Sequence, residues 1–420
     1  MLGKRKKLVL FIMMAILMTS VLTGYSLGKT SDKKEPVTIT FMAFKEPTQT
    51  LQNLIKSFEE KNPGIKVNMQ VLPAQPDQQH NTYVTALSAG DSSMDALTMD
   101  VIWTAEFASA GWIMPLDKRF KKTSRDQYLP AAIESVTYNG HVYAVPRYTH
   151  SSVLYYRKDI IAQAPKTWGE LARIAKENIG KNGIKYGFVF QGNQYEGMVC
   201  NALEYIFSNG GKVIDGKKVV INSPKAIQGL QYMIDFIKIA PPGVTTYGEE
   251  DARNVFQQGD AIFMRNWPYA WPLLNGNESP VKGKIGIAPL PVGANGINGV
   301  PVIGGNNLAI SKYSKHPNET WKFIEFLSSA DSQKYAEINS GRMPARIALY
   351  SDKDLLNKDP FLSDLYNVFS KAKSRPVSPY YSKMSDSMQI YFHKALTGEM
   401  TAHQAIENVQ KELEKILKNK

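Results

Sequence analysis

Cysteine is nearly missing from this sequence of 420 residues, which contains a single one, Cys200. No intrachain disulfide can form, so the fold must be stabilised by burial of apolar side chains, and a chain of this length is long enough for that. Cys200 lies in an apolar pattern of helical period between Gly197 and Leu203, which predicts a buried, unreactive thiol. Long low-complexity tracts are missing as well, and the content of 43% hydrophobic and 21% charged residues is typical of globular domains.

Common catalytic and metal-binding motifs are also missing. The sequence has no nucleophile elbow, no Walker loop, no HExxH motif and no Cys/His spacing suited to a metal, and its six histidines form no close pair. We therefore expect neither an enzyme nor a cofactor. One enzymatic alternative stays open, a glycoside hydrolase with two carboxylates across a cleft, for which Asp91, Asp95 and Asp100 are the candidates.

The positive charge is not gathered into a stripe. The formal net charge is +12, and four of the positive charges fall at positions 4–7, before the first acidic residue, Asp32. The other basic residues are scattered and interleaved with acids, as in segment 411–415. A nucleic-acid backbone is normally followed by a continuous basic surface, so we expect no nucleic-acid partner.

The first 28 residues have the order of an export signal. The basic cluster precedes an apolar run from Leu8 to Leu22, which is short for a membrane span and has the length of a signal-peptide core. The segment 22–26 resembles the lipobox of bacterial lipoproteins, but Tyr25 stands where the lipidated cysteine belongs, so no thioether to lipid can form. We expect export to the outside or the cell surface, with cleavage before Lys29 or retention as an anchor, followed by a polar linker at 29–36.

The body of the chain begins with strand and helix patterns in alternation. Residues 37–44 alternate as a strand does, a helix follows with apolar residues at 51, 54, 55 and 58, and residues 65–71 form the next strand pattern. A helix at about 81–89 and a strand at 96–102 come next. Strand, helix, strand is a βαβ unit, so the sequence predicts an α/β fold with a parallel sheet and helices on both faces.

The segment 265–271 holds three large aromatic residues around a proline, at the end of a short predicted strand, 261–265. Aromatic faces are apolar and carry a negative π cloud, so they suit the C–H faces of a sugar ring. The alternative is an ordinary hydrophobic core. We expect Trp267 and Tyr269 to contact a ligand and Trp271 to lie in the core.

Several segments then follow one another in a specific order. A helix ends on Phe-Glu-x-x-Asn-Pro-Gly-Ile-x-Val, and later segments fit at 140–146, 154–159, 165–171, 265–271, 304–310 and 341–346. This order resembles the extracellular solute-binding proteins of ABC importers, family 1, which bind sugars, and most of all the trehalose/maltose-binding proteins. The resemblance covers essentially the whole chain after the predicted signal.

The resemblance implies two α/β lobes joined by crossing strands, with a ligand held in the cleft between them. Lobe one would comprise residues 37–146 and 301–345, and lobe two residues 147–300 and 346–420. The protein would be a monomer that captures a di- or oligosaccharide and delivers it to the permease of an ABC importer. A receptor for a non-sugar solute, such as a peptide, a polyamine or a metal, is the alternative.

Candidate ligand-binding residues follow the ends of predicted strands or the predicted crossovers, where ligands of open α/β sheets bind. They are Glu46, Asp100, Trp103, Tyr148, His150, Trp267, Tyr269, Gly305, Asn306 and Arg346. Carboxylates and the guanidinium group of Arg346 would hold hydroxyl groups of the ligand. A predicted turn at Gly304–Gly305 would let backbone N–H groups approach the ligand. Three alternatives stay open: Glu46 as a first-turn helix acid, Asp100 paired with a local donor, and Trp103 in the core.

Two residues depart from the trehalose/maltose-binding pattern. His150 stands where those proteins carry an aspartate, and Asn306 stands where they carry a tryptophan. The first change removes an acceptor, and the second removes a stacking surface that contributes on the order of 1 kcal/mol beyond area burial. We therefore hypothesise a related but different ligand, such as a longer α-glucan or another oligosaccharide.

Overall fold

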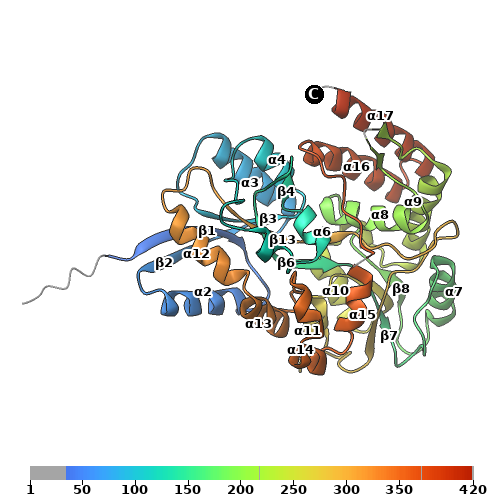
Figure 1. Ribbon diagram of the computed structural model, residues 1–420. Coiled ribbons are helices and arrows are strands. Elements are labelled where there is room, and N and C mark those ends of the chain that lie inside the picture. The colour runs from blue at the N-terminus through green and yellow to red at the C-terminus, as the bar shows by residue number, and fades with distance from the viewer. Residues whose placement is uncertain (1–34, 217, 370, 419–420) are drawn as a thin grey trace, which may run out of the picture. The chain divides into compact units, whose positions relative to one another are not determined.

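The structure, a computed structural model, describes residues 35–216, 218–369 and 371–418 (Figure 1). The predicted export signal, 1–28, and residues 29–34 of the predicted linker lie outside the described residues. Within the described part of the chain, no helix is both long enough and apolar enough to cross a membrane. From Val37 onward the chain folds as one unit, which contains two larger sheets and two hydrophobic cores.

The larger sheet has five strands. Their order is β2 (Ile65–Leu72), β1 (Val37–Phe44), β3 (Ala96–Asp100), β13 (Ile303–Ile310) and β6 (Val145–Ser151). β1 is parallel to β2 and β3, as the predicted βαβ unit requires. β13 is antiparallel to both β3 and β6, so the expectation of a parallel sheet is wrong for the part of the sheet that these three strands form. The predicted strand 96–102 ends earlier, at Asp100.

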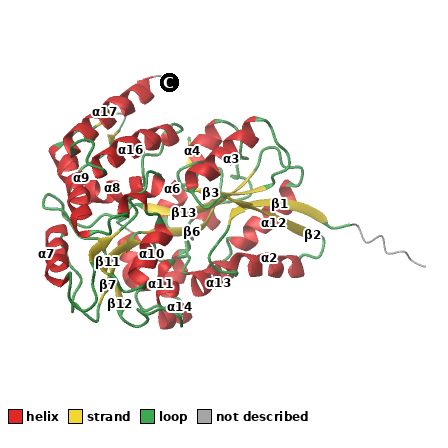
Figure 2. Ribbon diagram, turned by 180° about the vertical axis from the view of Figure 1, so that it is seen from behind, coloured by secondary structure: helices red, strands yellow, loops and turns green. Residues whose placement is uncertain are grey.

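Helices lie on both sides of this sheet. Figures 1 and 2 show α2 (Thr50–Lys61) on one side and α3 (Pro76–Ser88) and α4 (Thr104–Ser109) on the other. Phe58 of α2 packs against Phe323 of α12 (Pro317–Leu327), with ring centroids 5.0 Å apart. α3 begins before the predicted residue 81, at Pro76. Proline is favourable in the first turn of a helix, because the N–H that it lacks would have no acceptor within the helix there. The Tyr83 hydroxyl of α3 donates to the Thr98 carbonyl at 2.8 Å and ties the helix to the sheet.

The glycine pair at 304–305 lies inside strand β13, so the predicted turn is wrong. Gly305 has φ +126°, and a Cβ atom there would be 2.4 Å from the Tyr148 carbonyl oxygen on the neighbouring strand. The register between β13 and β6 shifts directly afterwards, between Asn306 and Asn307. Glycine is required here because two backbones approach closely at a bulge, where no side chain fits.

The second large sheet has four strands. Their order is β12 (Ile285–Ala288), β7 (Val153–Arg157), β11 (Ala261–Asn266) and β8 (Tyr186–Val189). β7 is antiparallel to both of its neighbours, and β11 is parallel to β8. Helix α7 (Trp168–Asn178) packs on this sheet. Trp168 at its start is buried, and the Thr167 hydroxyl caps the helix by accepting a hydrogen bond from the Glu170 N–H at 3.1 Å.

Four longer helices form a layer beside the second sheet (Figure 1). They are α8 (Glu196–Ser208), α9 (Pro224–Phe236), α16 (Tyr381–Leu396) and α17 (Ala402–Lys418). α16 packs against α8 and α17, and α17 packs against α9. Cys200 is buried on α8, and burial raises the pKa of its thiol, so the predicted buried and unreactive cysteine is confirmed.

Three segments run between the two large sheets. β6 is followed by β7 after a single residue, Ser152. The chain after β12 returns to the larger sheet as β13, and the segment around Lys373 crosses beside it, since the Ile303 N–H donates to the Lys373 carbonyl at 2.9 Å. The two sheets with their helices are the two lobes of the molecule, and these segments connect them.

Shorter elements complete the chain. The helices are α5 (Lys122–Arg125), α6 (Pro130–Glu134), α10 (Glu249–Gln257), α11 (Ala270–Leu274), α13 (Ala330–Ser340), α14 (Lys353–Lys358) and α15 (Leu362–Phe369). The 3-10 helices are Ile237–Ile239, Val244–Thr246 and Ile347–Ser351. The remaining strands are β4 (Thr137–Tyr138), β5 (His141–Val142), β9 (Ile214–Asp215) and β10 (Lys218–Val219).

Candidate functional site

A cluster of buried charged side chains follows the end of strand β1. Glu46 has a side chain 1% exposed, and Arg147 Nη2 of β6 lies 3.0 Å from its Oε1. Arg342 Nε, after helix α13, lies 3.9 Å from the same oxygen, and its Nη1 is 3.3 Å from His150 Nε2. α2 begins at Thr50 and has no acidic residue in its first turn, so the alternative that Glu46 serves as a first-turn helix acid is wrong.

The Tyr148 ring stands among these side chains. Its centroid is 5.3 Å from Arg147 Cζ, 4.8 Å from Arg342 Cζ and 5.0 Å from the His150 ring. Its hydroxyl donates a hydrogen bond to Asn306 Oδ1 on the adjacent strand β13. Burial raises the pKa of Tyr148 to about 12, so this hydroxyl is a donor at neutral pH.

The aromatic segment after β11 reaches the same region from the second sheet. The Trp267 ring stacks over the Arg265 guanidinium, with 4.1 Å from Cζ to the ring centroid, and its Nε1 donates to Glu249 Oε1 at 3.3 Å. The same ring borders Gly304 of the larger sheet, where a Cβ atom would be 3.3 Å from it. Trp267 therefore bridges the two sheets.

Tyr269 and Trp271 have different surroundings. The Tyr269 hydroxyl donates to Glu250 Oε1 at 2.7 Å, and its ring centroid is 5.6 Å from Arg342 Cζ. Trp271 packs edge-on against Phe361 with centroids 4.7 Å apart, and both rings are half-buried at the edge of the hydrophobic core that contains the larger sheet. The prediction that Trp271 lies in the core is therefore met only in part, because its ring packs against the core from outside.

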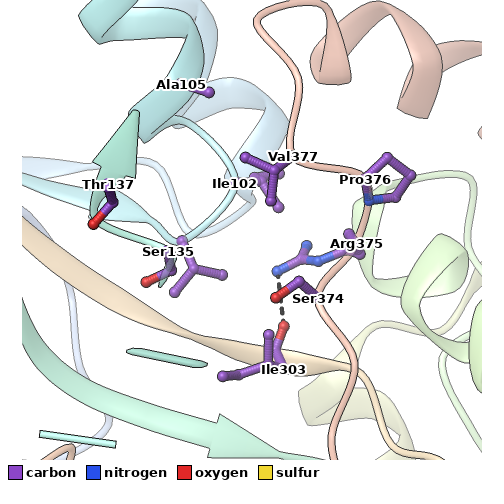
Figure 3. Close-up of a pocket in the computed structure, with 10 residues that line it drawn as sticks. Ile102, Ala105, Ser135, Thr137, Ile303, Ser374, Arg375, Pro376 and Val377 are labelled. Atoms are coloured by element: carbon purple, nitrogen blue, oxygen red, sulfur yellow. Dashed lines mark hydrogen bonds between the residues drawn. The ribbon is translucent and has the colours of Figure 1, made fainter. Parts of the chain in front are cut away.

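Asp100 lies beside a residue that sequence reasoning missed. Arg375, on the third crossing segment, is fully buried, and its Nη2 is 3.2 Å from Asp100 Oδ1 while its Nη1 is 2.6 Å from Glu196 Oε1. It also donates to the Ile303 carbonyl at 3.3 Å, as Figure 3 shows, beside a cavity of about 20 Å³. Arg375 is one of the basic residues that are scattered along the sequence, and no pattern around it indicates its two distant partners.

Two predicted residues lie elsewhere. Trp103 is buried and stacks on Phe107, with an interplanar angle of 17°, so its ring belongs to the core, which was its alternative interpretation. Arg346 donates from Nε to the Ser328 carbonyl at 2.8 Å, and its guanidinium covers the Tyr128 ring at 4.6 Å. The structure therefore places Arg346 with the elements around Tyr128 rather than with the cluster around Glu46.

A larger cavity, of about 730 Å³, is lined by residues of the segments 164–166, 287–299 and 361–371. None of the ten predicted residues lines it. This cavity is therefore separate from the candidate site.

The acids proposed for the hydrolase alternative have structural contacts. Asp95 is buried and accepts the Thr40 N–H at 2.8 Å, and Asp91 accepts the Ser93 N–H at 2.8 Å. Asp100 is paired with Arg375. Among the described residues, no group of three or more His, Cys, Asp or Glu side chains could hold a metal ion.

The site around Glu46 and Trp267 offers carboxylates, guanidinium groups, an imidazole and aromatic faces, which together can hold a polar ligand with apolar faces.

Comparison with known proteins identifies the family to which the chain belongs. The model of the bacterial extracellular solute-binding protein family matches residues 44–334, which is more than half of the chain. The chain belongs to this family. Its fold is accordingly the two-lobed fold of periplasmic binding proteins, and the family resemblance found in the sequence is confirmed.

This solute-binding protein has well-covered relatives. It is 37% identical over 371 residues to a Deinococcus radiodurans protein named "Probable ABC transporter-binding protein", covering 85% of this chain and 88% of that one. Maltose-bound MalE3 of T. maritima is similar with a TM-score of 0.86 and 43% identity, over 90% of this chain and 99% of that one. A maltotriose-binding protein of Pyrococcus abyssi is 26% identical over 387 residues, covering 88% and 79% of the two chains.

Proposed function

We propose that this solute-binding protein captures a di- or oligosaccharide between its two lobes and delivers it to the membrane permease of an ABC sugar importer. The observation that carries the proposal is the meeting of Trp267, from the second sheet, with Gly304 of the first, beside the charged cluster around Glu46. Rings for apolar faces and charged groups for hydroxyls are the two kinds of contact that a sugar needs. The maltose in the T. maritima structure and the name of the P. abyssi relative support this cargo.

In this proposal the ligand contacts come from both lobes. Glu46 and Asp100 accept hydroxyl hydrogens, and the rings of Tyr148, Trp267 and Tyr269 cover sugar faces. The other contacts come from His150, Asn306 and the backbone of Gly305. The predicted lobe boundaries, 37–146 and 301–345 for lobe one and 147–300 and 346–420 for lobe two, are kept in this proposal except at the first crossing. Residues 147–151 belong to β6 of the larger sheet, so the chain leaves lobe one at Ser152.

Capture in this proposal proceeds by closure and involves no chemical step. A ligand that contacts both lobes stabilises the closed form by its differential affinity, and the connections between the sheets absorb the movement. The protein acts outside the cytoplasmic membrane as a monomer, and the permease distinguishes loaded from empty protein by the arrangement of the lobes. The ligand leaves unchanged, so the protein is not an enzyme.

Calorimetric titration with trehalose, maltose, maltotriose and longer α-glucan, β-glucan and xylan oligomers tests the proposal. We expect one-to-one binding of at least one sugar, weakened at least tenfold by Trp267→Ala. The matched control is Tyr335→Ala, on the exposed side of α13, which should bind as the unchanged protein does. Chromatography of the sugar after incubation should return it intact, and cleavage products would revive the hydrolase alternative. If none of these sugars binds, a non-sugar solute becomes the favoured ligand. Binding limited to disaccharides would contradict the hypothesis of a longer oligosaccharide ligand.

A further inference from the structure

Two neighbouring acids of helix α10 bind the two aromatic residues that the proposed sugar site uses. Glu249 Oε1 accepts the indole N–H of Trp267 at 3.3 Å, and Glu250 Oε1 accepts the Tyr269 hydroxyl at 2.7 Å. α10 begins at Glu249, so both acids belong to its first turn. Acids are common in the first turn of a helix because they favour the positive end of its dipole, so no sequence pattern singles these two out.

The place of Trp267 is fixed by its backbone and by one face of its ring. Its N–H donates to Asn266 Oδ1 at 2.8 Å, and its carbonyl accepts the Tyr155 hydroxyl at 2.9 Å. The Arg265 guanidinium covers one ring face, with Cζ 4.1 Å from the ring centroid. A sugar can therefore stack only on the opposite face, and the strength of stacking depends on how that face is turned.

The rotation of the indole about its Cβ–Cγ bond is set by Glu249. This torsion has broad energy wells in tryptophan, so a hydrogen bond or packing has to select one orientation. The carboxylate of Glu249 is itself fixed, because its Oε2 accepts the hydroxyl of the buried Tyr195 at 2.7 Å. The Asn266 amide also donates to the Glu249 carbonyl at 3.1 Å, which ties the start of α10 to the end of β11.

Glu250 restrains Tyr269 in a similar way. Its other oxygen, Oε2, accepts a hydrogen bond from Arg253 Nη2 of the same helix at 2.7 Å, so the carboxylate connects the helix to the ring hydroxyl. The side chain of Glu250 is half exposed, so water competes for its oxygens. We therefore expect Glu250 to contribute less than Glu249 does.

We propose that Glu249 and Glu250 are positioning residues of the sugar site, which orient the rings of Trp267 and Tyr269 without contacting the sugar. This inference rests on the proposed sugar-binding function and adds two residues to the site that serves it. Both ring donors, the indole N–H and the Tyr269 hydroxyl, are used by carboxylates. The two rings therefore bind a sugar through their faces and donate no hydrogen bond to it.

Calorimetric titration of Glu249 variants tests the inference with every sugar named for the proposed function, from trehalose and maltose to the xylan oligomers. Glu249→Leu removes the acceptor and should weaken binding about fivefold, because the indole is then free to turn. Glu249→Gln keeps an acceptor without the charge and should bind within about twofold of the unchanged protein. Glu250→Leu should weaken binding about twofold, because water already competes at this position.

The matched control is Asp251→Leu in the same helical turn. Asp251 accepts the Gly248 N–H at 2.9 Å, so its loss should lower stability and leave the affinity for sugar unchanged. Thermal melting checks that each variant is folded. Equal weakening by Leu and Gln at position 249, or full affinity in folded Glu249→Leu, would overturn the inference and leave the proposed function intact. If the unchanged protein binds none of the sugars, both fail.

Hydrogen exchange of the indole N–H supplies a second measurement on the unchanged protein. The sequence has six tryptophans, and the Nε1–H signal of Trp267 is assigned in a 1H–15N NMR spectrum by its loss in Trp267→Phe. Glu249 and Trp267 both belong to elements that pack at the second sheet, so we expect slow exchange with and without sugar. An N–H that exchanges freely until a sugar is added would donate to the sugar, and the inference would be wrong.

Discussion

Gly304 leaves free the space that the indole ring of Trp267 needs. A Cβ atom at position 304 would lie 3.3 Å from Cη2 and Cζ3 of that ring, closer than side chains normally approach. The two residues come from different sheets, so this contact sets how closely the aromatic segment approaches the larger sheet.

The first prediction concerns this contact. Gly304→Ala should displace the Trp267 ring by a few tenths of an ångström and weaken binding of the captured sugar by about fivefold, near 1 kcal/mol, because stacking depends on ring position. Stability to urea should change by less than about 1 kcal/mol. Gly64→Ala is the control, since a Cβ atom there has no neighbour within 4 Å. Unchanged affinity in the Gly304 variant would argue against a ligand contact by Trp267.

The second prediction concerns the buried pair beneath Trp267. Arg265 donates from Nε to Glu204 Oε2 at 2.8 Å, and both side chains are 2% exposed. Arg265→Met should lower the free energy of unfolding by about 3–5 kcal/mol, because Glu204 would remain buried without its cation. The double variant Arg265→Met/Glu204→Leu should recover most of this loss, as measured by urea unfolding.

The exposed pair of Arg173 and Glu177 on α7 is the matched control for this prediction. Arg173→Met should change the free energy of unfolding by less than about 1 kcal/mol. A double variant at 265 and 204 that is as unstable as the single one would show that the loss comes from packing and not from the unpaired carboxylate.

The third prediction concerns pH. Burial, and then the neighbouring carboxylate of Asp359, raise the pKa of Glu337 from 4.5 to about 8. The folded protein therefore keeps this proton up to about pH 8, whereas the unfolded chain releases it near its ordinary value. This group contributes on the order of a few kcal/mol to the free energy of unfolding. The contribution is fully present below pH 4.5 and is lost as the pH rises towards 8.

Urea unfolding at pH 5, 6, 7 and 8 measures this effect by comparison with Glu337→Gln, which cannot titrate. The difference in unfolding free energy between the two proteins should change steadily across this range. Trp271 reports on the same place, because its Nε1 donates to Asp359 Oδ1 at 2.8 Å, so its fluorescence should change over the same pH interval. A constant difference between the two proteins would contradict the raised pKa.

Local patterns predicted the elements near the site well. The alternation of residues 37–44 and the spacing of apolar residues in the following helix appear in the structure as β1 and α2. Glu46 and Trp267 could be placed at strand ends because that position depends only on where a strand stops. The α/β class followed from the same local signals, and the order of family motifs supplied the two lobes.

Pairings distant in sequence could not be predicted in the same way. Arg342 covers the Tyr148 ring and Arg375 pairs with Asp100, across nearly 200 and 275 residues, and no local sequence pattern indicates such contacts. Gly304–Gly305 was predicted as a turn because glycine commonly forms turns, whereas here the close approach of β6 requires it within a strand. The antiparallel placement of β13 likewise depends on the return of the chain from the second sheet.

Arg375 is shared by two carboxylates from different parts of the molecule, Asp100 at the end of β3 in the larger sheet and Glu196 at the start of α8 beside the second sheet. If the lobes open as proposed, Arg375 can follow only one of these acids, and the other acid loses its ion pair. The proposed empty form would then carry an electrostatic penalty that the occupied form avoids. Under that proposal, a residue with no ligand contact contributes to the affinity for the cargo.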